Sequence, residues 1–333
     1  METLLGILCL MILAIVALWD SQPEGKQTQR ATICHGDLKV TFRDNSESPR
    51  VLSGIGSLFN VKDAPFFDTY DPNSEGASGG MNLEHIICGH ADPHNAFSPR
   101  HGEYNMYVLS DEKSVLWYRK AEDDPWGIES ITKITVTPPH YLDIEFACEV
   151  TNPQRFGERG YTILFWCNYM NDVAKIPICF RGKSSLDSEE SWVYADASQI
   201  TRDWDNGGTY RHIAASDLPY DDDHNFKLNI WSYEYPRYTR PFYYGLLRHG
   251  MVYMLMFDRA WTPEDEIRFS IFKFKLKQFP RPAWDYQYVI RRLQPAKVYG
   301  YRARVVWKKF ISPEDCMTEY DHWVSEMGFD RRC

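Results

Sequence analysis

Clustered positive charge is missing from this chain of 333 residues, in which 37 Lys and Arg residues are outnumbered by 46 Asp and Glu residues. The formal net charge is −9. Nucleic-acid surfaces and patches that bind anionic membranes depend on clustered Lys and Arg side chains. We therefore expect no nucleic-acid partner, whereas an acidic polysaccharide held by a local basic pocket is compatible with the composition.

The cysteines lack a recognisable pattern. Seven of the eight follow the N-terminal apolar segment, without a CxxC pair or regular spacing. This arrangement is typical of neither a disulfide framework nor a zinc ribbon. Cys148 and Cys167 lie in apolar, strand-like runs, which favours small buried side chains. An oxidising compartment would allow one or two bridges, but the spacing assigns no connectivity.

A long apolar run occurs at residues 4–18. It has the length of a signal-peptide hydrophobic region and is slightly short for a membrane-spanning helix, which needs about 20 residues. Glu2 replaces the usual positive charge, and the cleavage site ending at Ala17 is only fair. We predict that residues 1–18 are a signal peptide or an uncleaved N-terminal anchor and that residues 19–32 are a linker. The protein would then be exported, and periplasmic, extracellular or membrane-anchored.

Helical periodicity is rare in the rest of the chain, whereas apolar and polar residues alternate repeatedly. A period of two is typical of β-strands. The connections are rich in Pro, Gly and Asp, and no strand is regularly followed by a helix, which argues against a parallel α/β sheet. We predict an all-β fold, a single large antiparallel β-sandwich domain over residues 33–333. Strands are expected at 37–42, 51–59, 114–119, 128–137, 141–150, 161–169, 176–181, 191–195, 227–233, 251–257, 267–274, 284–290 and 299–307.

One short helix is predicted near the C-terminus. Ser312 is a favourable N-cap, Pro313 fits the first helical position, and the acids that follow suit the positive end of the helix dipole. Gly328 can end the helix. We expect the helix to pack as a lid on the sandwich through one apolar face, made of Cys316, Tyr320, Trp323, Val324 and Met327.

Aromatic residues make up 15% of the chain. Pleated sheets accept such rings well, and flat rings also stack on sugar faces in carbohydrate-binding clefts. We assign most of the rings to packing. The remaining rings are available for binding a carbohydrate partner.

Several segments resemble a family of uncharacterised exported bacterial proteins. They are PFYYGLLRHGMVYMLMFDR at 241–259, PAWDYQYVI at 282–290, YGYRAR at 299–304, WGIES at 126–130, PPHYLDIEF at 138–146 and FWCNYMN at 165–171. The resemblance implies an architecture similar to the galactose-mutarotase-like supersandwich, which sugar epimerases, some polysaccharide lyases and domains of glycoside hydrolases share. It implies a fold but no particular reaction.

The densest polar stretch, residues 84–104, contains four of the ten histidines. His90, Asp92 and His94 could hold a divalent metal, although their spacing matches no established zinc pattern. Alternatively, the histidines of this stretch satisfy backbone groups in a long ordered loop.

The same stretch offers an acid–base site. A single imidazole with a carboxylate or basic neighbour is enough for proton transfer on a sugar. His101 and Glu103 are therefore candidate catalytic residues, and Arg100 is a candidate substrate-binding residue.

A second polar group surrounds the turn at Gly250. Tyr244, Arg248 and His249 offer the base and the cation with which polysaccharide lyases remove a proton next to a uronate carboxylate. We name them as candidate catalytic residues. Alternatively, Tyr244 packs across strands and Arg248 pairs with a surface acid.

Two tryptophans are candidate substrate-binding platforms. Trp204 lies between Asp203 and Asp205, two carboxylates of the kind that glycoside hydrolysis needs. Trp284 shares one sheet face with Tyr286 by alternation, so packing is the competing interpretation.

The sequence thus favours a carbohydrate-active enzyme, of lyase, epimerase or hydrolase type, that acts on a poly- or oligosaccharide through His and Tyr acid–base chemistry. It predicts that the histidine stretch and the Arg248-His249 turn meet in one cleft. A non-catalytic glycan-binding protein at the cell surface would instead expose coplanar rings, and a structural envelope protein would show a broad apolar patch. No cofactor is predicted beyond the divalent metal left open above.

Overall fold

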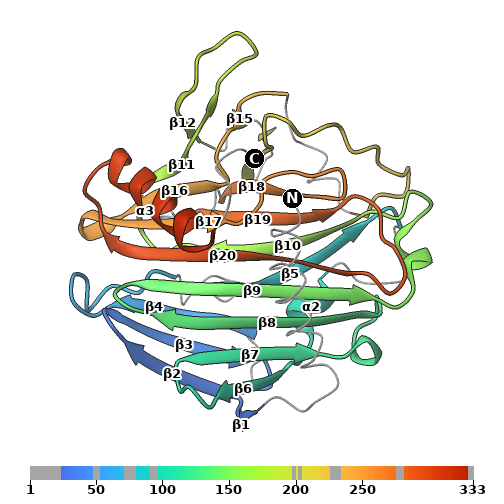
Figure 1. Ribbon diagram of the computed structural model, residues 1–333, viewed down its shortest axis with the longest axis horizontal. Coiled ribbons are helices and arrows are strands. Elements are labelled where there is room, and N and C mark those ends of the chain that lie inside the picture. Colours follow the sequence, from blue (N-terminus) through green and yellow to red (C-terminus); the bar gives the residue numbers. More distant parts are fainter. Residues whose placement is uncertain are drawn as a thin grey trace.

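The computed structural model describes residues 24–47, 53–70, 80–90, 97–196, 200–201, 205–225, 234–274 and 281–328. The chain folds into two antiparallel β-sheets that pack face to face, with one longer helix near the C-terminus (Figure 1). The predicted fold class, an all-β antiparallel sandwich with a short C-terminal helix, is confirmed.

The larger sheet contains eleven strands within the described residues. Along its main path they are β1 (Gly25–Gln27), β6 (Asn105–Leu109), β7 (Ser114–Arg119), β8 (Ile128–Thr137), β9 (Tyr141–Val150), β20 (Val298–Lys309), β17 (Met251–Phe257), β16 (Phe242–Leu247), β11 (Val173–Lys183) and β12 (Ser191–Ala195), with β15 (Arg237–Tyr238) also on β11. Figure 1 shows this sheet running from β6 and β7 at the bottom to β11 and β12 at the top.

The second sheet has nine strands in the same part of the chain. In order they are β13 (Ile200–Thr201), β14 (Asp205–Tyr210), β18 (Asp265–Phe274), β19 (Ala283–Ile290), β10 (Thr162–Tyr169), β5 (Gly80–Cys88), β4 (Ser53–Asn60), β3 (Leu38–Asp44) and β2 (Arg30–His35). Short helical segments are α2 (Ser98–His101), η1 (Ala121–Asp123), η2 (Pro153–Phe156) and η4 (Arg248–Gly250).

The main hydrophobic core lies between the two sheets. On β19, Trp284, Tyr286 and Tyr288 belong to this core. Because successive side chains of a strand point to opposite faces, Asp285 and Gln287 lie on the outer face of the nine-stranded sheet. That outer face carries the polar residues described below.

Helix α3 (Pro313–Glu326) covers the outer face of the other sheet, beside β16, β17 and β20 (Figure 1). Ser312 caps it by accepting a hydrogen bond on Oγ from the backbone N of Asp315 at 3.2 Å, and Gly328 follows its end with φ of 70°. The helix and the sheet share a small apolar cluster that includes Cys316, Trp323, Phe242, Tyr244, Met254 and Val306. The predicted lid is confirmed.

The strand predictions differ from the structure both at the sheet edges and inside the sheets, where β5 and β16 were not predicted. Five ranges coincide with observed strands: 114–119, 128–137, 141–150, 191–195 and 251–257. The predicted linker is partly sheet, because β1 pairs with β6 and β2 pairs with β3. Edge strands such as β1 are exposed and carry no apolar alternation, so the sequence gives little sign of them.

The N-terminal apolar segment and the predicted strand 227–233 lie outside the described residues. Among the helices that the structure describes, none is both long and apolar enough to cross a membrane. Export therefore stays a prediction from the sequence.

Candidate active site

A row of polar side chains, most of them buried, crosses the outer face of the nine-stranded sheet. It runs over five neighbouring strands, β5, β10, β19, β18 and β14. Backbone register places Ser270 opposite Asp285, Arg268 opposite Gln287 and His85 opposite Phe165. We call this set the outer polar row: Glu84, His85, Tyr169, Asp285, Gln287, Ser270, Thr209, Arg268 and Glu266.

An irregularity in β5 puts Glu84 and His85 next to each other in this row. His85 lies opposite Phe165, but Leu83 lies opposite Trp166, so Glu84 is one extra residue in the ladder. Such a β-bulge redirects a side chain that regular alternation would send to the other face. Two consecutive polar residues can therefore contact each other on the outer face.

Glu84 has three polar partners at one end of the row. Its Oε2 lies 2.8 Å from His85 Nε2, and its Oε1 lies 2.7 Å from Arg100 Nη1 and accepts a hydrogen bond from Tyr169 Oη at 2.9 Å. Burial raises the pKa of Glu84, but His85, Arg100 and Tyr169 together hold that pKa below its usual range. Glu84 is thus kept as a carboxylate that fixes the position of the His85 ring.

Helix α2 closes over this part of the row. The rings of Phe97 and His85 are 4.0 Å apart between centroids, and Phe165 packs on His85 at 5.1 Å. Arg100 Nη2 is buried and has no hydrogen-bond partner among the described residues. That nitrogen therefore has a donor that the described residues do not use.

Asp285 is the second carboxyl group of the row, and its pKa is shifted in the opposite direction to that of Glu84. Its side chain is 2% exposed, and its one hydrogen bond within the described part of the chain is from the backbone N of Asn168 to Oδ1, at 2.7 Å. Burial, and then the charge of Glu84, raise the pKa of Asp285 well above its usual range. The protonated acid is therefore favoured.

Glu84 and Asp285 lie on strands that are separated only by β10. Two strand spacings put their backbones about 10 Å apart. A pair of carboxyl groups whose surroundings push their pKa values in opposite directions is the arrangement from which an acid and a base on one substrate are identified. The row thus has the parts of an acid–base site.

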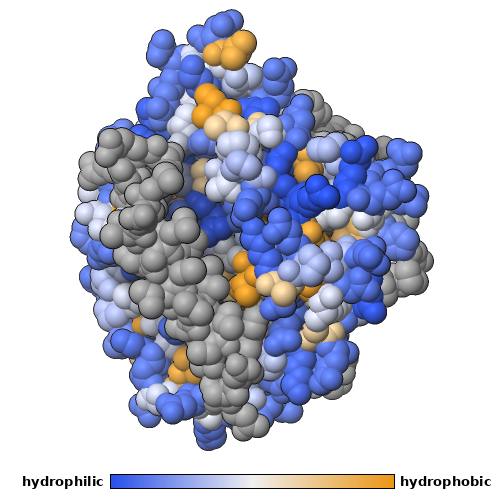
Figure 2. Space-filling view, turned by 45° about the vertical axis from the view of Figure 1, so that its right-hand side comes forward, coloured by the Kyte–Doolittle hydropathy of each residue, from blue (hydrophilic) through white to orange (hydrophobic). Residues whose placement is uncertain are grey.

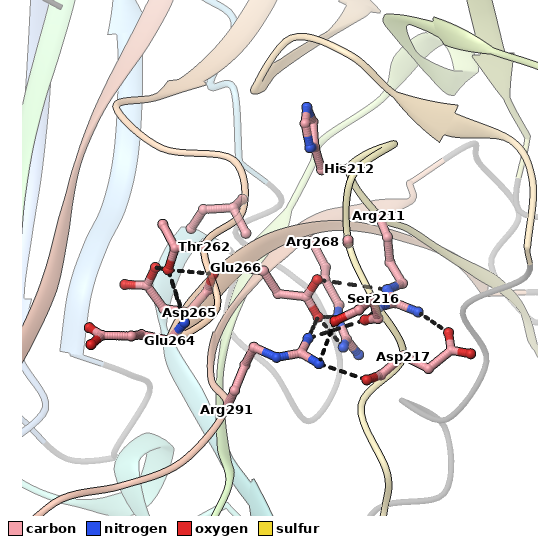
Figure 3. Close-up of polar contacts among 12 residues, drawn as sticks. Arg211, His212, Ser216, Asp217, Thr262, Glu264, Asp265, Glu266, Arg268 and Arg291 are labelled. Carbon is pink, nitrogen blue, oxygen red and sulfur yellow. Dashed lines mark hydrogen bonds and ion pairs between the residues drawn. The ribbon is translucent and has the colours of Figure 1, made fainter. Parts of the chain in front are cut away.

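The row continues toward β18 and β14 through neutral side chains. Gln287 Nε2 donates to Ser270 Oγ at 2.7 Å, and Thr209 Oγ1 lies 3.3 Å from Ser270 Oγ. Gln287 Oε1 is buried without a hydrogen-bond partner in the part of the chain that the structure describes. The row ends at Glu266, around which several arginines gather (Figure 3).

Arg100, on α2, is the sequence-predicted site residue that contacts this row, through Glu84. His101 and Glu103 are exposed just beyond it, outside the buried row. Trp284 is fully buried in the core, and its Nε1 donates to the backbone O of Ile176 at 2.9 Å. This corrects the candidate platform role of Trp284, because a ring enclosed between two sheets cannot stack on a sugar.

The residues around Gly250 also take structural roles. Tyr244 is buried beneath α3, where its ring stacks on Phe310 at 6.0 Å between centroids, which corrects its candidate catalytic role. Arg248 Nε pairs with the surface carboxylate of Asp172 at 3.1 Å. His249 contacts the ring of Phe67 edge-on. These contacts match the alternatives given from the sequence. Tyr244 packs across strands, and Arg248 pairs with a surface acid.

The C-terminal end of the histidine stretch and the turn at Gly250 lie near opposite ends of β3. One end of β3, Asp44, accepts a backbone hydrogen bond from Tyr104, next to Glu103. The other end, Leu38, pairs with the last residue of β4, and the turn after β4 places Phe67 against His249. A strand of this length spans about 20 Å. The single cleft expected from the sequence stays a prediction.

Three predicted site residues, Trp204, Asp92 and His94, lie outside the described residues. His90 is described and half-buried. The described residues contain no group of three or more His, Cys, Asp or Glu side chains that could hold a metal ion. The divalent-metal hypothesis therefore stays a prediction.

Sequence reasoning missed Asp285 and gave no role to Glu84 or His85. One signal was available for Asp285. Alternation assigned Trp284 and Tyr286 to one face, which leaves the residue between them on the other face. For Glu84 and His85 no signal marked the bulge.

No family model matches the chain, and no curated protein matches it in sequence. Membership of an exported bacterial family is thus not confirmed. Among solved structures, a GalM/aldose epimerase homologue from C. elegans matches with a TM-score of 0.45 and 8% identity, over 86% of this chain and 100% of that chain. The α-N-acetylgalactosaminidase NagBb from Bifidobacterium bifidum matches with a TM-score of 0.40 and 9% identity, over 90% of this chain and 39% of that chain. Similarities this low carry no information about activity.

Proposed function

We propose that this protein is a carbohydrate-active enzyme that works on a poly- or oligosaccharide by acid–base chemistry on the outer polar row. Asp285 is the proton donor, and His85, oriented by Glu84, is the proton acceptor. The observation that carries the proposal is the opposite shift of the pKa values of two buried carboxyl groups, Glu84 and Asp285, on one face of a sheet.

The roles follow from the protonation states. A general acid must carry its proton at the working pH, and burial favours this for Asp285. A general base must be held in a fixed orientation, and the contact of 2.8 Å from Glu84 Oε2 to His85 Nε2 provides one. Arg100 and Tyr169 in turn hold Glu84. The same pair of groups serves lyase, epimerase or hydrolase chemistry.

A saccharide fits the polar atoms that the row leaves without partners. Buried polar groups almost always find a hydrogen-bond partner. Arg100 Nη2 offers a donor and Gln287 Oε1 offers an acceptor. A sugar hydroxyl can both donate and accept, so one polyhydroxylated ligand satisfies both kinds of atom.

The two alternative functions gain less support from the surface. The exposed large apolar side chains among the described residues include only two aromatic rings, Phe66 and Tyr194, from separate segments. Figure 2 shows a face on which hydrophobic side chains form small separate spots among hydrophilic ones. Neither a platform of coplanar rings nor a broad apolar patch is present in the described part.

The test is turnover of the purified chain from residue 24 onward against a panel of polysaccharides. New reducing ends, unsaturated uronates and changes of sugar configuration are measured together. We expect product from the wild type and a loss of about 100-fold or more in Asp285→Asn. Asp172→Asn is the matched control, because it removes the same group from the surface pair with Arg248.

Full activity of Asp285→Asn would refute the assignment. A wild type that yields no product in any readout, but is retarded in gels that contain a polysaccharide, would favour the non-catalytic glycan-binding alternative instead.

A further inference from the structure

The end of the outer polar row is a cluster of arginines around one buried carboxylate (Figure 3). Glu266 is completely buried. Arg268 donates to Glu266 Oε1 through both Nε, at 2.5 Å, and Nη2. Arg291 Nη1 and Arg211 Nε each approach the same carboxylate to 3.7 Å.

The cluster carries more positive than negative charge. Arg211, Arg268 and Arg291 contribute three charges, and Glu266 offsets one of them. Asp217 also pairs with Arg211, at 3.0 Å, but the Asp217 side chain is 95% exposed, so solvent screens that pair. Buried charge without a matching partner is strongly unfavourable. An added anion would relieve the excess.

Burial is the main reason that two outlying arginines are less easily ionised than in water. It lowers the pKa of Arg291 against the attraction of Glu266, and repulsion from Arg268 and Arg211 adds to the effect. Burial and Arg211 likewise lower the pKa of Arg237. Both shifts mean that the cationic forms are less favourable here than in water.

A short segment of the chain lies on the guanidinium groups at the rim. Arg211 Nη2 donates to the backbone O of Ser216. Arg291 donates through Nη1 to the same backbone O at 3.2 Å, and through Nη2 to Ser216 Oγ at 3.1 Å and to the backbone O of Asp217 at 2.6 Å. The exposed carboxylate of Asp217 thus occupies the place at Arg211 that an incoming carboxylate would use.

The cluster lies on the same face of the sheet as the proposed reaction centre. Arg268 is opposite Gln287, two residues from Asp285 along β19. Arg291 follows the end of β19, six residues from Asp285, which corresponds to about 20 Å of strand. An oligosaccharide of several units bound over Asp285 could therefore place a charged substituent at the cluster.

We propose that Arg211 and Arg291 bind the anionic substituent of an acidic saccharide, a carboxylate or a sulfate ester, in place of the Asp217 side chain. Guanidinium groups suit both anions, because their planar N–H groups match pairs of oxygens. This inference rests on the proposed function and specifies its substrate class.

The experiment measures binding of three oligosaccharides to the purified full chain by calorimetry, at low and high salt. The probes are an oligogalacturonate, a sulfated galactan fragment and a neutral galactan fragment of equal length. We expect one of the acidic probes to bind more tightly than the neutral one. The sulfated and uronate arms distinguish the two sources of the anion.

Two variants should change the affinity for the acidic probe in opposite directions. Arg291→Gln should weaken binding of the acidic probe about tenfold, since a charge-assisted contact is lost. Asp217→Asn removes the competing carboxylate and should tighten it, on the order of threefold. Arg30→Gln, on the exposed strand at the opposite edge of the sheet, is the charge-matched control and should change nothing.

Equal binding of acidic and neutral probes, or equal effects of Arg291→Gln and Arg30→Gln, would overturn the inference. If the acidic probe binds through Arg291 but no saccharide is turned over, the proposed catalytic function fails and the anion site stands. If only neutral saccharides are bound and turned over, the anion site fails and the proposed catalytic function stands.

Discussion

One of the contacts between α3 and the eleven-stranded sheet is made by a carboxylate, Glu319, and lowering the pH should weaken this contact. Tyr141 Oη donates to Glu319 Oε2 at 2.9 Å, and Lys308 Nζ donates to Oε1. His140 Nε2 lies 3.8 Å from the same Oε1. Burial raises the pKa of Glu319, but its bonds to His140, Lys308 and Tyr141 outweigh burial and bring this pKa from 4.5 to about 2.

The sign and size of the effect follow from this shift. The folded pKa is below the unfolded value, so the contribution to stability is complete above pH 4.5 and is lost as the pH falls toward 2. Each unit of pKa shift corresponds to about 1.4 kcal/mol. The ionised Glu319 therefore contributes about 3 kcal/mol at most, and its side chain is only 15% exposed, so solvent screening is limited.

The variant Glu319→Gln keeps the shape and removes the charge. Urea unfolding, followed by tryptophan fluorescence at several pH values, should show the variant about 1–3 kcal/mol less stable than the wild type at pH 7. The difference should shrink to near zero between pH 5 and pH 2. Asp321→Asn on the same helix, where Asp321 forms no ion pair within the described residues, serves as control. A difference between Glu319→Gln and wild type that stays constant with pH would refute the reasoning.

Three further predictions concern the core, the candidate acid and the thiols. A Cβ on Gly245 would lie 2.2 Å from the ring of Trp284, so Gly245→Ala should lower the free energy of unfolding by about 1–3 kcal/mol, measured as a lower urea midpoint. Burial raises the pKa of Asp285, so Asp285→Asn should be more stable than the wild type at pH 7. The difference in stability between the two should grow as the pH rises from about 4. Thermal melts that show a loss of stability in the variant would contradict this. Cys34 is exposed, whereas burial raises the pKa of Cys88 to about 12 and that of Cys179 to about 11. Peptide mapping after brief native labelling should therefore find Cys34 modified and Cys88 and Cys179 intact.

The fold could be predicted where one side of an element is apolar and the other is not. Strands 128–137 and 141–150 alternate between buried and half-buried residues, and their predicted bounds coincide with the observed ones. Helix α3 was marked by Ser312 at its cap and an apolar face. In each case the local pattern and the tertiary environment agree.

Strand β5 escaped prediction for the opposite reason. All nine of its residues are buried, so the strand lies between two covered faces and shows no alternation. Its Glu84 and His85 therefore suggested an irregular polar loop. The bulge that brings both side chains to one face depends on pairing with β10, which follows about 75 residues later in the sequence. No local pattern specifies that pairing.

The two outer faces of the sandwich are covered in different ways, and this difference indicates where function lies. On the eleven-stranded sheet, α3 covers an apolar cluster with Trp323 at its centre, which stabilises the fold directly. The nine-stranded sheet also carries an apolar cluster on its outer face, which includes Ile163 and Val289. Beside that cluster, however, Asp285 is buried in surroundings that disfavour its ionised form, and several arginines surround Glu266. Apolar residues at those positions would stabilise the protein better. Polar groups at unfavourable buried positions cluster at functional sites, and this is the reason that we propose the outer face of the nine-stranded sheet as the place of the chemistry.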